Sequence, residues 1–590
     1  MLAIFAALSI GAAMSAGAPV AAKKPQTPAR PHFTLTVLHN NDAESQLIDA
    51  GTGLEDFGGA ARATTLADNL KAAATRGPGP GGKRGVVMLS SGDNFLAGPE
   101  FNASLEKGPP FYDAIAMEHI GYDAVAIGNH EFDFGPDVLA DFIGSFSDGT
   151  PFLSANLDVS GEPTLAALEA EGRIAESVVI RERGERIGII GATTPRLPSI
   201  SSPRNVVVHE DVAGEIQEEV DELEGQGVGI IILIAHLQSI QEDLDLAPML
   251  SGVDIMIAGG GDELLANPGD LLVPDGSPIF GPYPLFATDG DGKQVPVITT
   301  NGAYRYFGRL VAQFDRHGEM VGVNGGPVRV SGVPPDAVAP DPQVLAEVTE
   351  PVQEAIAALA ENVVANSEVD LDGVRARIRT EETNEGNLIA DSLLDRARSL
   401  APAFGAPQAD VALQNGGGIR NDSIIPAGPI TELDTFDMVP FTNFLSVVPD
   451  VPRSQFKELL ENAVSRVEFG DGRFAQIAGF SFVWDDGGTP QVVDNDGNVL
   501  TPGTRVVSAT LDDGTPIISG GAVVAGPALN IATIDFLARG GDQYPYRGAS
   551  FTTLGEVYQQ SLEAYLTTTL AGQITAADYP FGGEGRITRI

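Results

Sequence analysis

Short runs of apolar residues in the first half of the chain repeatedly end in polar or acidic residues. The runs are rich in Val, Ile and Leu and too short for buried helices, which predicts buried β-strands. The residues that follow them are Asn, Asp, Glu, Gly and His, which are typical of loops that carry chemistry. The runs and their endings are Thr34–Leu38 with Asn41–Glu44, Val86–Leu89 with Ser90–Asp93, Ala126–Ile127 with Gly128–Asp133, Gly229–Ile234 with His236, and Val253–Ile257 with Gly259–Glu263.

These endings are expected to form one site, because an open α/β sheet binds ligands beyond the carboxyl ends of its strands. Carboxylate, amide and imidazole donors in a chain without Cys suit hard or borderline divalent cations. Two such ions ~3.5–4 Å apart are a common device for phosphoryl transfer to water. Asp93 is the candidate bridge, since two close dications repel unless an anion lies between them. His130, with Asp133 three residues later, fits an acid that stabilises phosphate or protonates the leaving oxygen.

A second set of signals lies in the last third of the chain. The segment 379–391 has the pattern of a capped helix start, and Asn415–Arg420 is a Gly-rich turn ending in Arg. Both are ways to hold a phosphate group. Phe441 and Phe536 stand on separate predicted loops and could clamp a planar base, while Asp542 could accept hydrogen bonds from ribose hydroxyls.

At these motifs the chain resembles the calcineurin-like metallophosphoesterases, specifically the bacterial periplasmic 5′-nucleotidases with their UDP-sugar hydrolase and 2′,3′-cyclic phosphodiesterase relatives. The resemblance implies an α/β fold, in which a β-sandwich flanked by helices precedes a second α/β (α+β) nucleotidase C-terminal domain. It further implies that His130 and Asp133 form the catalytic dyad. The implied metal ligands are Asp42, Asp93, Asn129 and His236, and the implied nucleotide-binding residues are Arg379, Asn415, Arg420, Phe441, Phe536 and Asp542.

The chain departs from the family in two of its metal motifs. Asp42-Ala43-Glu44 replaces Asp-x-His, and Ala258–Glu263 replaces Gly-Gly-His followed by a second His or Gln. An ungapped count places Gly260 at the first His position and Asp262 at the last, while a shift of one residue presents Glu263 instead. We therefore expect Glu44 and Asp262 to be oxygen ligands. Two divalent metal ions are expected, with Mn²⁺, Mg²⁺ or Ca²⁺ favoured and Zn²⁺ possible; the alternative is that one metal site has decayed.

The expected activity is metal-dependent hydrolysis of nucleotide phosphate esters, as in a 5′-nucleotidase, with a hydroxide activated by two metals attacking phosphorus. Two alternatives stay open. A 2′,3′-cyclic nucleotide phosphodiesterase or UDP-sugar hydrolase would tolerate a second substituent on phosphorus. A nucleotide-binding protein with a decayed metal site would bind without hydrolysis.

Composition narrows the partners and the cellular location. The net charge of −45 disfavours DNA, RNA and anionic membranes as partners, so a small-molecule nucleotide is the expected one. Residues 1–22 are apolar and end in small residues, which predicts a signal peptide and a periplasmic or secreted protein. A short N-terminal membrane anchor is the alternative, since the segment lacks the usual basic start.

Proline and glycine mark the expected domain boundaries. The stretch 331–342 is rich in Pro and has the composition of a linker, and helical spacing follows it to residue 365. The expected organisation is a metallophosphoesterase domain at 33–330, a linker and bridging helix at 331–365, and a substrate-binding nucleotidase C-terminal domain at 366–590.

Overall fold

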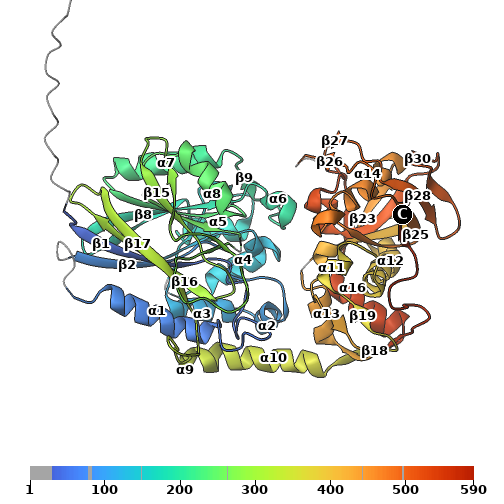
Figure 1. Ribbon diagram of the computed structural model, residues 1–590, viewed down its shortest axis with the longest axis horizontal. Helices are drawn as coiled ribbons and strands as arrows, with labels where there is room; N and C mark the ends of the chain where they lie inside the picture. The colour runs from blue at the N-terminus through green and yellow to red at the C-terminus, as the bar shows by residue number, and fades with distance from the viewer. Residues whose placement is uncertain (1–29, 78–82, 148, 262, 442, 495–496) are drawn as a thin grey trace, which may run out of the picture.

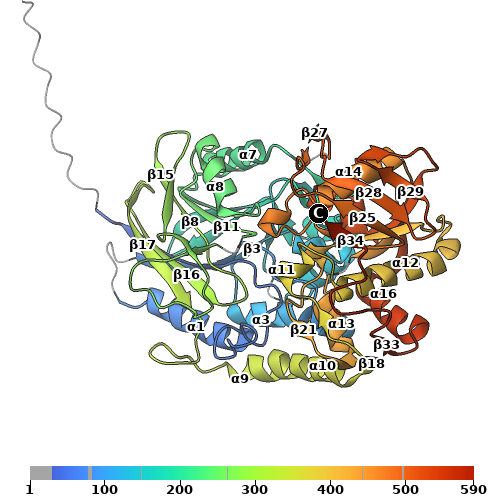
Figure 2. The ribbon, with the colours of Figure 1, turned by 45° about the vertical axis from the view of Figure 1, so that its right-hand side comes forward.

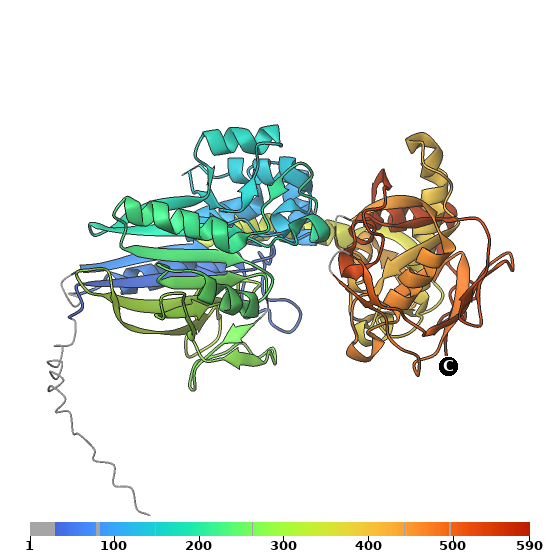
Figure 3. The same ribbon diagram turned by 90° about the horizontal axis from the view of Figure 1, so that it is seen from above.

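The computed structural model describes residues 30–77, 83–147, 149–261, 263–441, 443–494 and 497–590. The predicted signal peptide, 1–22, and the predicted ligand Asp262 lie outside these ranges. Figure 1 shows the remainder as two halves joined by a long helix, and Figure 3 shows the same halves side by side from above. Within the described ranges, no helix combines the length and the apolar character that crossing a membrane requires.

The first half is built on two large β-sheets with a shared apolar core, and its described residues add two two-stranded ribbons, β5 (Leu157–Asp158) with β9 (Val207–Val208) and β12 (Leu264–Leu265) with β13 (Ile279–Gly281). The seven-stranded sheet has the order β17-β16-β1-β2-β3-β4-β6 and is parallel from β1 to β6, and the six-stranded sheet has the order β14-β15-β11-β10-β8-β7. The strands of the first sheet are β1 (Phe33–Asn40), β2 (Lys83–Ser90), β3 (Ala124–Ala126), β4 (Phe152–Leu153), β6 (Ile174–Ala175), β16 (Tyr306–Phe314) and β17 (Met320–Arg329). Those of the second are β7 (Ser177–Glu182), β8 (Glu185–Thr193), β10 (Ile230–His236), β11 (Ile255–Gly259), β14 (Leu285–Thr288) and β15 (Gln294–Ile298).

Alternation along β1 explains the layering. Leu35 and Val37 point into the core between the sheets, whereas Leu38 belongs to a separate core beneath the helices. Strand β10 is apolar at nearly every position and buried throughout, as expected for a central parallel strand covered on both faces. The helices of this half are α1 (Ala60–Ala74), α2 (Pro99–Lys107), α3 (Tyr112–Ile120), α4 (Gly135–Gly144), α5 (Pro163–Ala170), α6 (Leu197–Ile200), α7 (Val212–Gly225) and α8 (Ile240–Leu246).

A continuous helical segment connects the halves. It comprises α9 (Pro342–Val344), the π-turn η4 (Leu345–Thr349) and α10 (Glu350–Glu361). In Figures 1 and 2, α10 runs beneath both halves, where it contacts α2 of the first and α13 (Glu432–Met438) of the second. The helix ends at Glu361 rather than at the expected residue 365. The β-branched pair Val363–Val364 instead starts strand β18 (Val363–Ser367), which pairs with two other strands.

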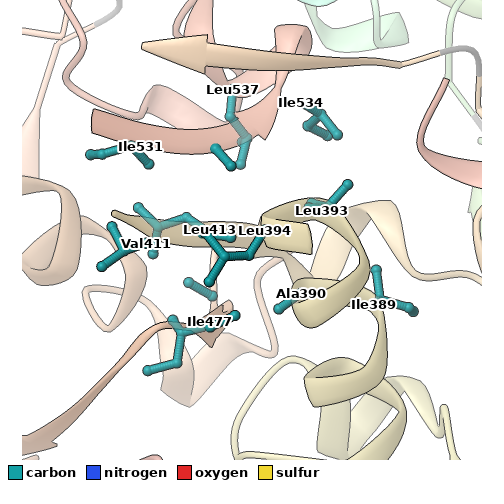
Figure 4. Close-up of a cluster of buried hydrophobic side chains, with 14 of the residues drawn as sticks. Ile389, Ala390, Leu393, Leu394, Val411, Leu413, Ile477, Ile531, Ile534 and Leu537 are labelled. Carbon is teal, nitrogen blue, oxygen red and sulfur yellow. The ribbon is translucent and has the colours of Figure 1, made fainter. Parts of the chain in front are cut away.

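The second half is built around helix α12 (Asn384–Phe404), whose start matches the capped helix expected from the sequence. Thr383 caps it by accepting a hydrogen bond from the backbone N–H of Gly386 at 3.0 Å. Figure 4 shows Ile389 and Leu393 of this helix beside apolar residues of the neighbouring strands. The five-stranded sheet under it consists of β24 (Ala475–Ala478), β20 (Val411–Asn415), β31 (Leu529–Ile534), β23 (Phe444–Val451) and β32 (Thr552–Val557).

Among the described residues, two further sheets, several short helices and two two-stranded ribbons complete this half; the ribbons are β19 (Leu371–Asp372) with β21 (Ile424–Ile425) and β26 (Val492–Val493) with β27 (Val499–Thr501). The second five-stranded sheet consists of β30 (Ala522–Val523), β29 (Pro516–Ser519), β28 (Val506–Leu511), β25 (Phe480–Trp484) and β34 (Ile587–Arg589), and β22 (Gly428–Thr431), β18 and β33 (Gln573–Ile574) form the three-stranded one. The other helices are α11 (Arg375–Ile378), α14 (Arg453–Ala463), α15 (Asp535–Ala538) and α16 (Tyr558–Ala564). No strand pairing links the sheets of the two halves among the described residues, which is compatible with the expected domain boundaries.

His39, near the end of β1, is a structural residue with a distinctive electrostatic state. Its ring is fully buried, stacks on Tyr283 and makes a 2.9 Å hydrogen bond to the tyrosine hydroxyl through Nε2. Burial lowers the pKa of His39 to about 3. Below pH 6.5 the His39 side chain of the unfolded chain therefore takes up a proton, whereas that of the folded protein does so only near pH 3. The contribution of His39 to the free energy of unfolding is accordingly highest above pH 6.5 and falls as the pH drops from 6.5 towards 3.

We predict that His39→Leu lowers the free energy of unfolding at pH 7.5. At pH 5.0 this gap between variant and wild type should be smaller by ~2 kcal/mol, because only the wild type loses stability over the roughly 1.5 pH units below the unfolded pKa of the histidine. Thermal unfolding at both pH values measures the gap. The control variant is His317→Leu, which removes an exposed imidazole and leaves the buried contact between His39 and Tyr283 intact. An equal gap for His39→Leu at both pH values would show that this histidine protonates in the folded state.

Candidate active site

Asp42, Asp93 and His236 form a buried cluster where the two sheets of the first half meet. They follow or end β1, β2 and β10, and each offers a ligand atom within 4.8 Å of those of the other two. Asp93 Oδ2 lies 2.9 Å from His236 Nε2, a contact that joins the seven-stranded sheet to the six-stranded one. Strand ends from both sheets therefore converge on one point, as the repeated polar endings predicted.

The turns after β1 and β2 hold both aspartates in the left-handed region, with φ of 51° at Asp42 and 52° at Asp93. Asp tolerates this conformation better than most residues. The backbone N–H of Asp42 donates to the carbonyl of Gly92, and that of Glu44 donates to the carbonyl of Asp93, each at 3.0 Å. Position 92, directly before Asp93, requires glycine, because a Cβ there would lie 2.8 Å from the backbone nitrogen of Gly128.

The cluster buries two carboxyl groups beside a single imidazole. Burial would raise the pKa of Asp93, but His236 and His130 lower it to about 2. Burial opposes the charged imidazole of His236, but Asp93 raises its pKa to about 10. Burial also raises the pKa of Asp42 well above its usual value, and His236 offsets this only in part. A buried pair of carboxylates with one imidazole is a donor set that fits a divalent cation.

Asn129 lies beside this cluster, so four of the predicted ligands are close together. Its Oδ1 accepts hydrogen bonds from His236 Nε2 at 3.1 Å and from the side-chain amide of Gln238. Among the described residues, Glu44 and Glu263 do not join the three-residue cluster. Glu44 acts on it electrostatically, by raising the pKa of Asp42. Its role as a ligand stays a prediction.

His130 and Asp133 lie together on the loop after β3. Asp133 Oδ2 is 2.6 Å from His130 Nδ1, and Asp133 Oδ1 accepts a 2.8 Å hydrogen bond from the hydroxyl of Ser201. Burial disfavours the charged imidazole, but Asp133 and then Asp93 raise the pKa of His130 well above its usual value. The imidazole is 24% exposed, so it can reach a substrate while a carboxylate fixes its orientation.

Glu131, which lies between His130 and Asp133 in the chain, is fully buried and does not face solvent. Its carboxylate accepts hydrogen bonds from the backbone N–H groups of Asp93, Asn94 and Gly128 at 2.8–3.0 Å, and from the side-chain amide of Asn94. It therefore ties the loop after β2 to the loop after β3 and supports the backbone of both.

A cavity of about 350 Å³ lies between the halves and is lined by both sets of predicted residues. From the first half, His130 and Asp133 reach it, whereas Asp42, Asp93 and His236 are not among its lining residues. Its volume falls within the ~300–1,000 Å³ typical of small-molecule sites. All the predicted nucleotide-binding residues line it, namely Arg379, Asn415, Arg420, Phe441, Phe536 and Asp542.

The contacts within this cavity leave groups facing a ligand. Asn415 Nδ2 donates to Asp542 Oδ2 at 2.6 Å, and the Arg420 guanidinium lies over the ring of Phe441, 5.3 Å from its centroid. Burial, together with Arg375 and Arg420, lowers the pKa of Arg379 to about 10. The Nε of Arg379 is buried and has no hydrogen-bond partner among the described residues. A buried, unpaired guanidinium N–H among other cations is a binding group for an anion.

Sequence reasoning missed several residues that the fold brings to this cavity. Arg375 lies one helical turn before Arg379, a spacing that could have identified it. Arg539 lies three residues after the predicted base-binding Phe536, and its Nη1 donates to the hydroxyl of Ser202 across the two halves at 3.1 Å. No local signal marked Ser201 and Ser202, because they lie far along the chain from the dyad.

Comparisons with known proteins agree with this arrangement. Residues 363–548 match the family model described as "5'-nucleotidase, C-terminal domain". A 5'-nucleotidase of Mus musculus is 30% identical over 475 residues, covering 78% of this chain and 77% of the mouse protein. The trifunctional nucleotide phosphoesterase protein YfkN of Bacillus subtilis is 28% identical over 536 residues, 86% of this chain but 32% of YfkN. The crystal structure of a 5'-nucleotidase precursor from Thermus thermophilus is 32% identical with a TM-score of 0.68, over 95% of this chain and 99% of that one. The resemblance and the fold class inferred from the motifs are confirmed.

We predict that Glu131→Gln lowers both stability and kcat. The new amide would place N–H groups against backbone N–H donors, and each buried donor left unpaired costs ~1–3 kcal/mol. The loops that carry Asp93 and His130 would then separate, so kcat should fall together with the melting temperature. Exposed Glu106, which accepts one amide N–H from Asn102, offers the matched control Glu106→Gln with neither effect expected. Unchanged melting and turnover in Glu131→Gln would contradict the role assigned to this carboxylate.

Proposed function

The chain belongs to the 5′-nucleotidase family of metal-dependent phosphoester hydrolases, and we propose that its substrates are nucleoside 5′-monophosphates. The observation that carries this proposal is the single cavity lined by His130 and Asp133 on one side and by arginine, phenylalanine and carboxylate groups on the other. A ligand that spans it meets a proton-transfer dyad at one end and a nucleoside-binding surface at the other.

The arginines of the cavity suit the phosphate end. Arg375, Arg379 and Arg420 gather positive charge on the surface of a chain whose net charge is −45, which favours a small dianion there. The buried Nε of Arg379 has no partner among the described residues, so a phosphate oxygen would satisfy it. A bidentate guanidinium contact also fixes orientation, which a reaction at phosphorus requires.

Two aromatic rings and a carboxylate suit the nucleoside end. Phe441 and Phe536 both line the cavity from separate segments, so a planar base can lie against their faces. Asp542 accepts from Asn415 through Oδ2, and its other oxygen can accept from a ribose hydroxyl. The unusual left-handed backbone at Asp542, with φ of 52°, turns this side chain into the cavity lining.

Metal ions would be held by Asp42, Asp93, Asn129 and His236, with Glu44 and Asp262 as further proposed ligands. When bound, such ions supply a water of lowered pKa and neutralise charge on the phosphoryl oxygens. His130 then donates a hydrogen bond or a proton to the leaving ester oxygen, while Asp133, held by Ser201, keeps its ring oriented. The oxygen-rich donor set supports Mn²⁺, Mg²⁺ or Ca²⁺ over Zn²⁺.

The size of the cavity bears on the alternatives. At about 350 Å³ it lies near the lower end of the ~300–1,000 Å³ range for small-molecule sites, which favours a mononucleotide over a sugar nucleotide. A cyclic mononucleotide is of similar size to a mononucleotide, so that diester stays the second candidate. We further propose a periplasmic or secreted location, on the strength of the apolar start of the chain.

We predict that metal-stripped protein releases phosphate from AMP when Mn²⁺, Mg²⁺ or Ca²⁺ is restored, with lower rates on 2′,3′-cyclic AMP and UDP-glucose. Phosphate and adenosine formation measures the rate on AMP, whereas chromatography of the AMP isomers formed from the cyclic diester and of the UMP formed from UDP-glucose measures the other two rates. Faster turnover of the cyclic diester would favour the phosphodiesterase instead. AMP binding without turnover under any of the added ions would favour the non-hydrolytic alternative.

We predict that Phe441→Ala and Phe536→Ala each raise KM for AMP about 5- to 150-fold, because stacking of a base on an aromatic ring contributes ~1–3 kcal/mol. Their effect on kcat should be smaller, since the rings are expected to contact the base rather than the reacting phosphate. Initial-rate kinetics give both constants. Phe469, which is 73% exposed and lies outside the cavity, supplies the control Phe469→Ala. An unchanged KM in both cavity variants would exclude a stacked base.

A further inference from the structure

Gln238, two residues after the predicted ligand His236, has a backbone conformation that its side chain disfavours. Its φ is +90°, a value at which glycine is the usual residue. Non-glycine residues keep such a conformation when the surroundings impose it, and these positions gather at functional sites. The residue is half-buried just beyond the carboxyl end of β10, on the same edge as the metal cluster. Its conformation and its place therefore both indicate a role in the site.

The side chain of Gln238 points into the cluster rather than into solvent. Its Nε2 donates to Asn129 Oδ1, the oxygen that also accepts from His236 Nε2. The Gln238 amide and the predicted ligand His236 therefore donate to the same oxygen of Asn129, which is itself a predicted ligand. A terminal amide carries an oxygen and a nitrogen on the same carbon, so rotation about its last torsion presents the oxygen where the nitrogen now lies.

Gly260 lies directly against the backbone of Gln238. It occupies the position where the family resemblance calls for a ligating His. A Cβ on Gly260 would lie 2.7 Å from the backbone nitrogen of Gln238, 2.8 Å from its Cα and 3.0 Å from His236 Nε2. No imidazole can be attached there without moving the backbone after β10. The backbone of Gln238 thus fills the space beside Gly260, whose own N–H donates to the carboxylate of Asp42 at 3.1–3.2 Å.

We propose that the side-chain amide oxygen of Gln238 is a metal ligand, which completes the site of Asp93, Asn129 and His236 in place of the imidazole that is missing at Gly260. A neutral amide oxygen is a hard donor, as in Mg²⁺ and Ca²⁺ sites, and it adds no further negative charge to a cluster that already buries two carboxylates. The inference rests on the proposed function, because it assigns a ligand to the metal ions of that activity.

The test is Mn²⁺ binding to the metal-stripped full-length protein, measured by equilibrium dialysis with elemental analysis and by calorimetry. Gln238→Met keeps the length of the side chain but removes the oxygen, and Gln238→Gly also removes the unfavourable φ. Both should weaken the binding of one Mn²⁺ per chain at least ~10-fold. Gln238→Glu, which keeps an oxygen at the same reach, should retain binding.

Folding is separated from ligation by thermal unfolding without metal. Gln238→Gly should melt no lower than the wild type in the absence of metal, because glycine favours a φ of +90°, yet it should gain less than the wild type on addition of Mn²⁺. The matched control is Gln241→Met, since Gln241 is an exposed glutamine three residues away whose amide donates to Asp245. This control should bind Mn²⁺ like the wild type.

The outcomes distinguish this inference from the proposed function. Weaker Mn²⁺ binding in Gln238→Met and Gln238→Gly, with normal binding in Gln238→Glu and Gln241→Met, supports Gln238 as a ligand. Unchanged Mn²⁺ affinity in Gln238→Met, beside a wild type that binds Mn²⁺ and hydrolyses AMP, overturns the inference alone. A wild type that neither binds Mn²⁺ nor hydrolyses AMP overturns both.

Discussion

The buried charge of the Asp93 carboxylate is the constraint on which the arrangement of the first half depends. A charge out of contact with water must be compensated, and here His236 lies 2.9 Å away on the opposite sheet while the backbone N–H of His130 donates from a neighbouring loop at 2.8 Å. To supply these partners, the ends of β2, β3 and β10 must meet at one point. Glu131 reinforces that convergence, because its carboxylate gathers N–H groups from the loops after β2 and β3. The architecture of the first half is thus tied to the site by electrostatics as well as by its apolar core.

The two halves divide the chemistry by charge. The first half supplies buried carboxylates that favour divalent cations, and the second supplies arginines and aromatic rings that favour an anionic nucleotide. The cavity between them, which His130 and Asp133 line on the first side, suits a phosphate ester whose phosphate lies towards the first half and whose base contacts the second. The contact between Arg539 and Ser202 joins the halves at the cavity itself, next to the serine that holds Asp133. Substrate placement and orientation of the dyad consequently depend on the same interface.

The two departures from the family pattern, at Gly260 and at Glu44, both replace an imidazole. Loss of the imidazole at Gly260 coincides with a glutamine at a strained position whose backbone fills the adjacent space and whose amide reaches Asn129. Glu44 likewise introduces an oxygen donor where the family has an imidazole. As proposed ligands, Glu44 and Gln238 would make the site harder while Asp42, Asp93, Asn129 and His236 stay together, an arrangement that favours a remodelled site over a decayed one.

The sequence by itself determined the fold class, the order of the strand endings and the residue types of the site, because short apolar runs and their polar ends are local features. The same reasoning placed a capped helix start within 379–391 correctly, but it carried the bridging helix past Glu361, where pairing of β18 with distant strands overrides helical spacing. Tertiary structure alone decided that Glu131 is buried, that Ser201 holds Asp133, that Arg375 and Arg539 reach the cavity, and that Gln238 points at Asn129. These facts depend on contacts between segments far apart in the chain, and the physical cost of unpaired buried polar groups acts only after folding has brought those segments together.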